Sequence, residues 1–96
     1  MLGEKLKELR GSNGLLQRQV AAVLEVDTAL ISKMENNEKL VSRNHLKKLA
    51  LLFKLQEEDL LILWLAEKVY DLVKDEDLAI KAMKLVEQNI ILLSRK

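Results

Sequence analysis

Residues 17–36, QRQVAAVLEVDTALISKMEN, are the stretch that decides the fold. Apolar residues recur here at the spacing of two short helices that share a buried side and meet at a tight turn. The pattern therefore predicts a helix-turn-helix over residues 17–24 and 28–36. The residues predicted to face inward are Val20, Ala21 and Leu24 in the first helix, Val26 in the turn, and Leu30, Ile31 and Met34 in the second helix.

The second predicted helix has a polar outer face. Thr28, Ala29, Ser32, Lys33 and Asn36 fall within an arc of roughly 140°, away from the apolar residues. Their side chains are small or can form hydrogen bonds, and none is acidic. Small side chains allow a helix to approach the major groove of DNA closely, and polar ones can read base edges. This arc is therefore a candidate recognition surface.

Several residues around this stretch stand at spacings that are typical of one family. They are Leu9-Arg10 at the end of a first helix, Gly14-Leu15, Gln17, Ala21, Val26, Ile31, the pair Glu35-Asn36, and Ser42 at the start of a fourth helix. On these residues the chain resembles the lambda-repressor-like, Xre-type family of prokaryotic DNA-binding regulators. The resemblance covers a DNA-binding core of about residues 1–65, or two thirds of the chain.

The chain departs from the family pattern at four positions. Leu16 replaces a polar N-cap, Glu25 and Asn37 replace glycines, and Val41 replaces a frequent proline. Asparagine tolerates a left-handed backbone, so the change at Asn37 is mild. A left-handed Glu25 would cost on the order of 1 kcal/mol, and we therefore expect the turn between the two helices to have an adjusted shape.

The resemblance implies a sequence-specific transcription regulator that binds double-stranded DNA. Together with the apolar C-terminal segment described below, it leads us to expect a homodimer on a palindromic operator. Within that class the resemblance allows a phage-type repressor, a controller of a restriction-modification operon, or an antitoxin that represses its own promoter. It also implies an ion pair between Arg10 and Glu35. The residues expected to face base edges are Thr28, Ala29, Ser32 and Lys33, with a phosphate contact as the alternative for Lys33; those expected to hold phosphates are Gln17, Arg18, Asn36, Lys39 and Arg43.

Composition predicts an all-α protein with one domain over residues 1–96. The chain has no proline, three glycines and 3 % aromatic residues among 49 % hydrophobic ones, which leaves little material for strands and turns. The absence of cysteine excludes disulfides and fits a reducing compartment. The N-terminal residues resemble neither a signal peptide nor a membrane span, so we expect a cytoplasmic protein without a membrane partner.

The net charge of +1 conceals an uneven distribution of charge. Residues 1–55 contain ten Lys or Arg and six Asp or Glu, a net charge of +4, whereas residues 56–96 contain six and nine, a net charge of −3. Judged by charge alone, both halves could be ordinary solvent-exposed surface. Because the basic half carries the helix-turn-helix, the distribution favours attraction of DNA phosphates to that half.

For the whole chain we predict a lambda-repressor-like bundle of about five helices with an additional C-terminal helix. Asp27 is predicted to cap the recognition helix with its carboxylate. The residues predicted to be buried in the fourth helix are Leu46, Leu49, Ala50 and Phe53. The predicted helices span residues 2–12, 17–24, 28–36, a segment after Ser42, 57–73 and 77–94.

The segment over residues 66–96 is predicted to be a helical extension that supports dimerisation. Residues 60–66 are all apolar, and the apolar arc of the last helix spans about 180°, wider than packing on one core requires. A partner subunit would cover this surface, although both helices could instead fold back within one chain. Asn89 would then bond to its symmetry mate, to a backbone group or at the interface edge. The expected interface residues are Leu63, Trp64, Val86, Asn89, Ile90 and Leu93.

Catalytic patterns are absent from the sequence. The single histidine, His45, has no Cys or second His nearby in the pattern and is expected to be a surface residue. Asp75-Glu76-Asp77 suits a helix start without any chemistry. There is no Gly-rich phosphate loop or nucleophile motif. We therefore expect no enzymatic activity and no metal, cofactor or small-molecule ligand.

A second class of function remains open at this stage. The helix-turn-helix could serve mainly as a scaffold in an antitoxin or another protein-interaction adaptor. A scaffold would have no reason to keep the arc around Thr28, Ser32 and Lys33 free of acids, so the sequence favours DNA binding. The apolar tail suits either class.

Overall fold

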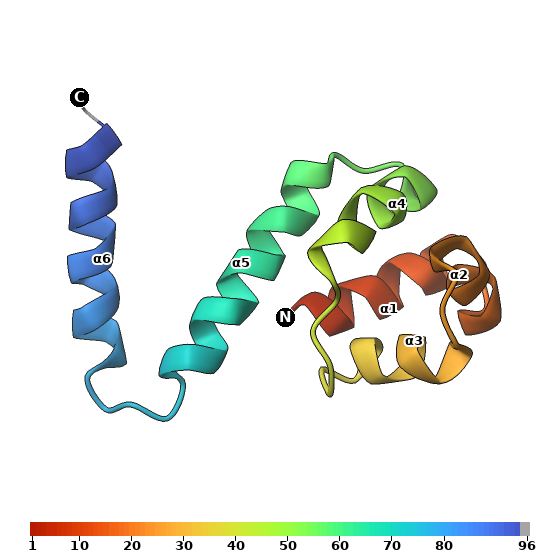
Figure 1. The fold of residues 1–96 in the computed structure, drawn as a ribbon, viewed down its shortest axis with the longest axis horizontal. Coiled ribbons are helices and arrows are strands. Elements are labelled where there is room, and N and C mark those ends of the chain that lie inside the picture. Colours follow the sequence, from red (N-terminus) through yellow and green to blue (C-terminus); the bar gives the residue numbers. More distant parts are fainter. Residues whose placement is uncertain (95–96) are drawn as a thin grey trace.

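The computed structural model describes residues 1–94, which form six α-helices and no strand (Figure 1). This confirms the predicted all-α class, with five helices and an additional C-terminal one. The fourth helix begins directly after Ser42, as predicted, and the other five begin and end within two residues of their predicted bounds. The helices are α1 (Leu2–Ser12), α2 (Gln17–Leu24), α3 (Thr28–Glu35), α4 (Arg43–Phe53), α5 (Glu57–Val73) and α6 (Ala79–Ser94).

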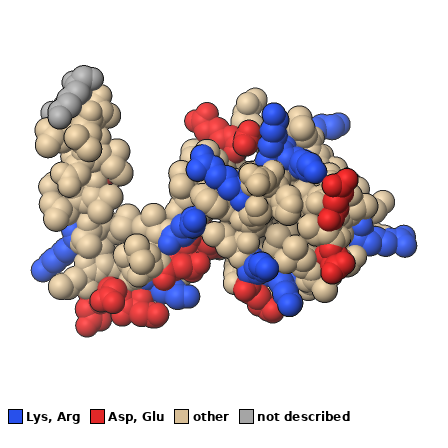
Figure 2. All heavy atoms as spheres, viewed as in Figure 1, with Lys and Arg blue, Asp and Glu red and all other residues tan. Residues whose placement is uncertain are grey.

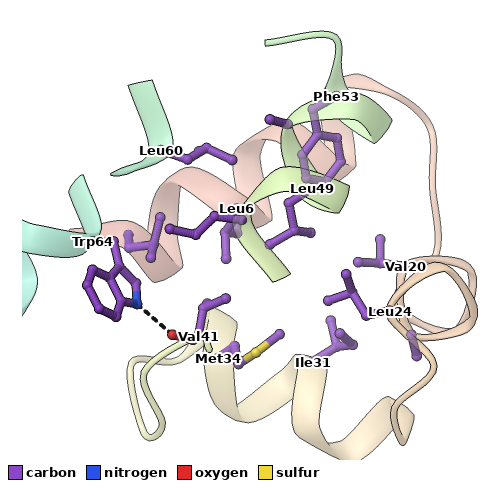
Figure 3. Close-up of a cluster of buried hydrophobic side chains, with 14 residues drawn as sticks. Leu6, Val20, Leu24, Ile31, Met34, Val41, Leu49, Phe53, Leu60 and Trp64 are labelled. Atoms are coloured by element: carbon purple, nitrogen blue, oxygen red, sulfur yellow. Dashed lines mark hydrogen bonds between the residues drawn. The ribbon is translucent and has the colours of Figure 1, made fainter. Parts of the chain in front are cut away.

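The core lies among α1 to α4 and one side of α5 (Figure 3). Each helix contributes the residues of one stripe, because apolar side chains three or four positions apart share a face. The predicted inward residues of the helix-turn-helix are confirmed, although Val26 and Leu30 are only half-buried. The most deeply buried side chains are Leu2, Ile31, Leu46, Leu49 and Leu60.

The turn between α2 and α3 keeps the left-handed conformation despite the absence of glycine. Glu25 has φ 58° and ψ 46°, and the N–H of Val26 donates to the carbonyl of Ala21 at 3.0 Å. The expectation of an adjusted turn shape is therefore wrong. The turn is closed by backbone hydrogen bonds and by Val26 against the core, which offset a cost of about 1 kcal/mol for the left-handed residue.

Asn37 is also left-handed, with φ 60°, as the sequence predicted. Its side chain has a further role, since its Oδ1 accepts the N–H of Gly3 at 3.1 Å and its Nδ2 donates to Glu4. Glu67 of α5 accepts the N–H of Leu2 at 3.3 Å. Two side chains from distant segments thus satisfy free N–H groups at the first turn of α1.

At α2 and α3 the side chain of the N-cap residue forms no capping hydrogen bond. Asp27 stands at the N-cap of α3, as predicted, but its carboxylate forms no capping hydrogen bond. At α2, Leu16 has no side-chain acceptor; instead the side chain of Gln19 accepts the N–H of Leu16 at 2.7 Å. Backbone geometry and burial, more than side-chain caps, hold these two helices in place.

Trp64 is a core residue, which corrects its predicted place at a subunit interface. The residue is 8 % exposed, and its indole Nε1–H donates to the carbonyl of Val41 at 2.6 Å (Figure 3). A buried indole needs a partner for its N–H, and the loop between α3 and α4 supplies one. Leu63, also expected at the interface, is half-buried and packs against the core.

The last helix, α6, stands apart from the rest of the molecule (Figure 1). None of its residues is buried. The alternative in which α5 and α6 fold back and hide their apolar surface within one chain is therefore contradicted. Within residues 1–94 no helix is both long and apolar enough to cross a membrane.

Candidate nucleic-acid interface

The outer face of α3 is presented by a helix whose other face is locked into the core. Ile31, Met34 and Glu35 are buried, whereas Thr28, Ala29 and Lys33 are exposed. Ser32, expected on the outer face, is half-buried at its edge. An exposed row with small residues and one Lys can enter a major groove without moving the core.

An ion-pair network fixes the C-terminal end of α3. Arg10 donates to Glu35 twice, from Nε to Oε2 at 2.6 Å and from Nη2 to Oε1 at 3.1 Å. Nη1 of Arg10 also donates to the carbonyl of Leu15 at 3.0 Å. The hydrogen bonds to Glu35 raise the pKa of the Arg10 guanidinium above its ordinary value. The ion pair that the family resemblance implied is thus confirmed, in the bidentate form.

Gln17 joins this network from the first turn of α2. Its Nε2 donates to Oε1 of Glu35 at 3.0 Å, and the residue is half-buried. One N–H of the amide is therefore used inside the protein, and the second N–H of Nε2 is the donor that remains for a phosphate. Arg18, the next residue, is exposed. Both residues lie at the N-terminus of α2, where free N–H groups favour an anion.

The segment after α3 brings two more predicted phosphate residues close to its last turn. Asn36 is the C-cap of α3, and its N–H donates to the carbonyl of Ser32 at 3.0 Å. The N–H groups of Glu38 and Lys39 both reach the carbonyl of Lys33, at 2.8 and 3.3 Å. This tight wrap places the exposed residues Asn36 and Lys39 beside the outer face of α3.

Arg43 begins α4 and lies over the ring of Trp64, with 5.6 Å between its Cζ and the ring centroid. Lys68 of α5 lies over the same ring, with Nζ at 4.5 Å from the centroid. The face of an indole attracts cations, so the ring restricts where both charges lie. Sequence reasoning missed this function of Trp64 and missed Lys68 as a neighbour of Arg43, because no local pattern links residues 43, 64 and 68.

The predicted phosphate-binding cations are not neutralised by the protein. Among the residues that the structure describes, the ion pairs involve neither Arg18, Lys33, Lys39 nor Arg43. Figure 2 shows Lys and Arg side chains over the helical body, interspersed with acidic ones, and a group of acidic side chains at the turn between α5 and α6. Unpaired cations on one part of a molecule attract a polyanion and make its binding depend on salt.

His45 lies next to this surface on the first turn of α4. It was expected to be a surface residue, but it is half-buried, and its Nδ1 is enclosed without a hydrogen-bond partner among residues 1–94. Residues 1–94 contain no group of three or more His, Cys, Asp or Glu side chains that could hold a metal ion. His45 is therefore part of the packing beneath α4.

The fold and the outward face of α3 define a helix-turn-helix DNA-binding protein. A family model described as helix-turn-helix matches residues 6–60, which is more than half of the chain. The chain belongs to this lambda-repressor-like, Cro/Xre-type helix-turn-helix family, and it is accordingly a DNA-binding regulator. Comparison with curated proteins and with solved structures gives no significant match.

Proposed function

We propose that the protein regulates transcription by binding a near-palindromic operator as a homodimer, with α3 of each subunit in a major groove. The observation that carries the proposal is the acid-free, exposed row of Thr28, Ala29 and Lys33 on a helix whose opposite face is buried. The protein would act in the manner of a phage-type repressor or of a restriction-modification controller, in the cytoplasm.

Within this proposal the contacts divide into two groups. Thr28, Ala29, Ser32 and Lys33 face base edges, and Lys33 is the best candidate for a guanine contact because its ammonium can donate to O6 and N7. The second group holds phosphates and so sets the position of α3 in the groove. It consists of Gln17, Arg18, Asn36, Lys39 and Arg43.

The homodimer is supported by the exposed apolar side of α6. Val86, Ile90 and Leu93 are 49 %, 62 % and 62 % exposed, and Asn89 is exposed beside them. Such a surface requires a cover in solution. A two-fold axis through α6 would present two α3 helices to successive major grooves about 34 Å apart, which predicts half-site centres ~10 bp apart or a multiple of that.

The test separates base reading from phosphate holding. An operator is first selected from random duplexes, and affinity for it and for a scrambled duplex is then measured at several salt concentrations. Lys33→Ala should weaken operator binding by roughly 1 to 3 kcal/mol and relax preference at one base pair. Arg43→Ala should weaken both duplexes alike and reduce the salt slope by about one unit.

Lys48→Ala is the control for simple loss of charge. Lys48 is exposed on α4 outside the proposed contacts, so the variant should change affinity for neither duplex by more than a small amount. Equal loss at operator and scrambled DNA in Lys33→Ala would remove Lys33 from base reading. Failure of the wild-type protein to prefer any duplex would refute sequence-specific binding.

A second candidate function is an antitoxin or adaptor whose α6 binds a different protein. The observation that favours it is the same uncovered apolar surface of α6. It differs from the first proposal in one measurable way, because α6 would then remain uncovered in the purified protein. A monomer at micromolar concentration that binds DNA only weakly would support this candidate over the homodimeric regulator.

A further inference from the structure

The side of α5 that faces away from the core carries an apolar stripe of its own. Leu60 and Trp64 point into the core, whereas Ile62, Leu65 and Val69 are 58 %, 46 % and 37 % exposed. The exposed residues recur at intervals of three and four positions and therefore share one face. Thus α5 has two apolar sides, and the helical body covers only one of them.

The last helix carries a regular apolar seam. Ala79, Met83, Val86, Ile90 and Leu93 follow one another at alternating intervals of four and three residues. This is the heptad spacing by which one helix packs along another over its whole length. Ala79 and Met83, at the start of the seam, are half-buried; the later residues are exposed.

Helices α5 and α6 diverge from their turn like the arms of a V (Figure 1). Near the turn, an apolar cleft lies between the two helices. It is lined by Leu65, Val69 and Val73 of α5 and by Ala79, Ile80 and Met83 of α6. Farther from the turn the arms separate. There Ile62 of α5 and the end of the α6 seam, Ile90 and Leu93, stay exposed, and no other segment of residues 1–94 covers them.

The apolar surface of α6 is not confined to the seam. Leu85 and Leu92 lie roughly a third of a turn from it on one side, and Ile80 and Ile91 lie roughly as far on the other. All four are 45 % or more exposed. A helix with apolar residues on several sides must be covered from several sides, and a flat contact between two copies of α6 would cover only one.

The amount of exposed apolar surface matches what a stable dimer buries. Twelve large apolar side chains of α5 and α6 are 37–80 % exposed. At ~100 Å² for a whole side chain, they expose on the order of 600 Å² per chain. A stable interface buries about 800 Å² per partner, of which roughly 60 % is apolar. The surface is therefore sufficient for one partner copy. Figure 2 also shows that α6 carries few charges.

We infer that two copies interlock, so that α6 of each copy enters the V between α5 and α6 of the other. This inference rests on the homodimer of the proposed function and specifies its geometry. Each α6 is then covered by its own α5 near the turn and by the α5 and the α6 of the partner beyond it. The four helices form one bundle on the two-fold axis, and neither copy alone contains a complete core in this part of the molecule.

Chain-specific cross-linking tests the interlocked arrangement directly, because the wild-type sequence contains no cysteine. A Leu65→Cys chain and an Ile90→Cys chain with a different affinity tag are mixed, allowed to exchange subunits, and treated with a short flexible bismaleimide. Interlocking predicts a predominant product that carries one chain of each kind. A dimer that pairs only α6 with α6 predicts cross-links between two Ile90→Cys chains and none to Leu65→Cys.

The matched control replaces Leu65→Cys with Leu51→Cys. Leu51 is 72 % exposed on α4, outside the V, so this pair should give no mixed product above background. Absence of the mixed product with Leu65→Cys, or a mixed product of equal yield with Leu51→Cys, would overturn the interlocked arrangement.

Sedimentation provides the second measurement. Ile90→Glu should convert the dimer to a monomer at micromolar concentration, whereas Leu51→Glu should leave it dimeric. No residue of α6 is buried, so the body of the monomer should keep its thermal unfolding transition. A wild-type monomer, or an Ile90→Glu dimer, would contradict the inference.

DNA binding distinguishes this failure from failure of the proposed function. Salt-dependent binding to a scrambled duplex depends on the helical body and should survive Ile90→Glu. If the mixed cross-link is absent while DNA binding remains, the interlocked geometry is wrong and the DNA-binding proposal stands. If the cross-link forms but no duplex is bound, the geometry stands and the proposed function is wrong.

Discussion

The recognition helix α3 and the last helix α6 are both rich in apolar residues, but α3 buries its apolar side within this chain and α6 does not. In α3 the apolar residues lie on one side, and Ile31 and Met34 are buried there. In α6 they lie on several sides, and no residue is buried. Neighbours three and four residues apart determine a face, but only a complementary surface elsewhere in the chain can cover it.

The contrast also separates two kinds of surface. The exposed side of α3 is polar, and long-range contacts that include the Arg10–Glu35 pair hold the helix in place. The exposed sides of α6 are apolar and are held by nothing beyond α5 in the part of the chain that the structure describes. The first kind suits a rigid, wet nucleic-acid groove, and the second suits a protein partner.

Removal of α6 should show the largest effect. A chain truncated after Lys74 keeps every core residue of the helical body, so its thermal unfolding should remain cooperative. It should be monomeric and should lose operator affinity by about 10²–10⁴-fold, since the two half-sites are no longer linked. Gel-shift titration and sedimentation measure both effects. An unchanged operator affinity would mean that α6 has no part in assembly on DNA.

Removal of the carboxylate of Glu35 should have the largest effect on the stability of the body. Glu35→Ala leaves the partly buried Arg10 without its partner, and the free energy of unfolding should fall by about 3 kcal/mol. Urea denaturation measures the loss. Glu38→Ala, which removes an exposed acid three residues later, should change stability little. Similar losses of unfolding free energy in both variants would show that the Arg10–Glu35 pair contributes no more to stability than an exposed acid does.

Two glycines of α1 provide a contrast within one helix. A Cβ on Gly3 would lie 2.6 Å from the carbonyl oxygen of Met34 and 2.7 Å from that of Glu35, whereas a Cβ on Gly11 would have free space. Gly3→Ala should therefore destabilise by about 1–3 kcal/mol. Gly11→Ala should stabilise by up to about 1 kcal/mol, through its better helix propensity. Thermal unfolding that ranks the two variants in the opposite order would contradict the close packing of α1 on α3.

The smallest expected effect tests whether Trp64 acts through its N–H group. Trp64→Phe keeps an aromatic ring but leaves the carbonyl of Val41 without its donor, so stability should fall by about 1 to 2 kcal/mol. The salt slope of binding to scrambled DNA should change less than in Arg43→Ala, because the ring still faces the cation. Tyr70→Phe, on the exposed part of α5, is the control and should leave stability unchanged.

Long-range contacts explain where sequence reasoning was wrong. Trp64 lies in the apolar run of residues 60–66, where every side is apolar, so periodicity could not show which side faces the core. Glu67 and Asn37 accept N–H groups of α1 across 65 and 34 positions, and neither role leaves a local pattern. Ser32 is half-buried, because how far the body covers the edge of α3 depends on neighbouring segments and not on the sequence of α3 alone.

The sequence by itself determined the helices, the helix-turn-helix and the polar side of α3, because helical hydrogen bonds and side-chain periodicity are local properties of the chain. The Arg10–Glu35 pair was also accessible, through the family resemblance. Only the tertiary structure decided which side of α5 enters the core, how Trp64 and Arg43 meet, and that α6 lies apart from the body. Those features depend on how surfaces from distant segments match in shape, and such complementarity exists only once the helices are placed together.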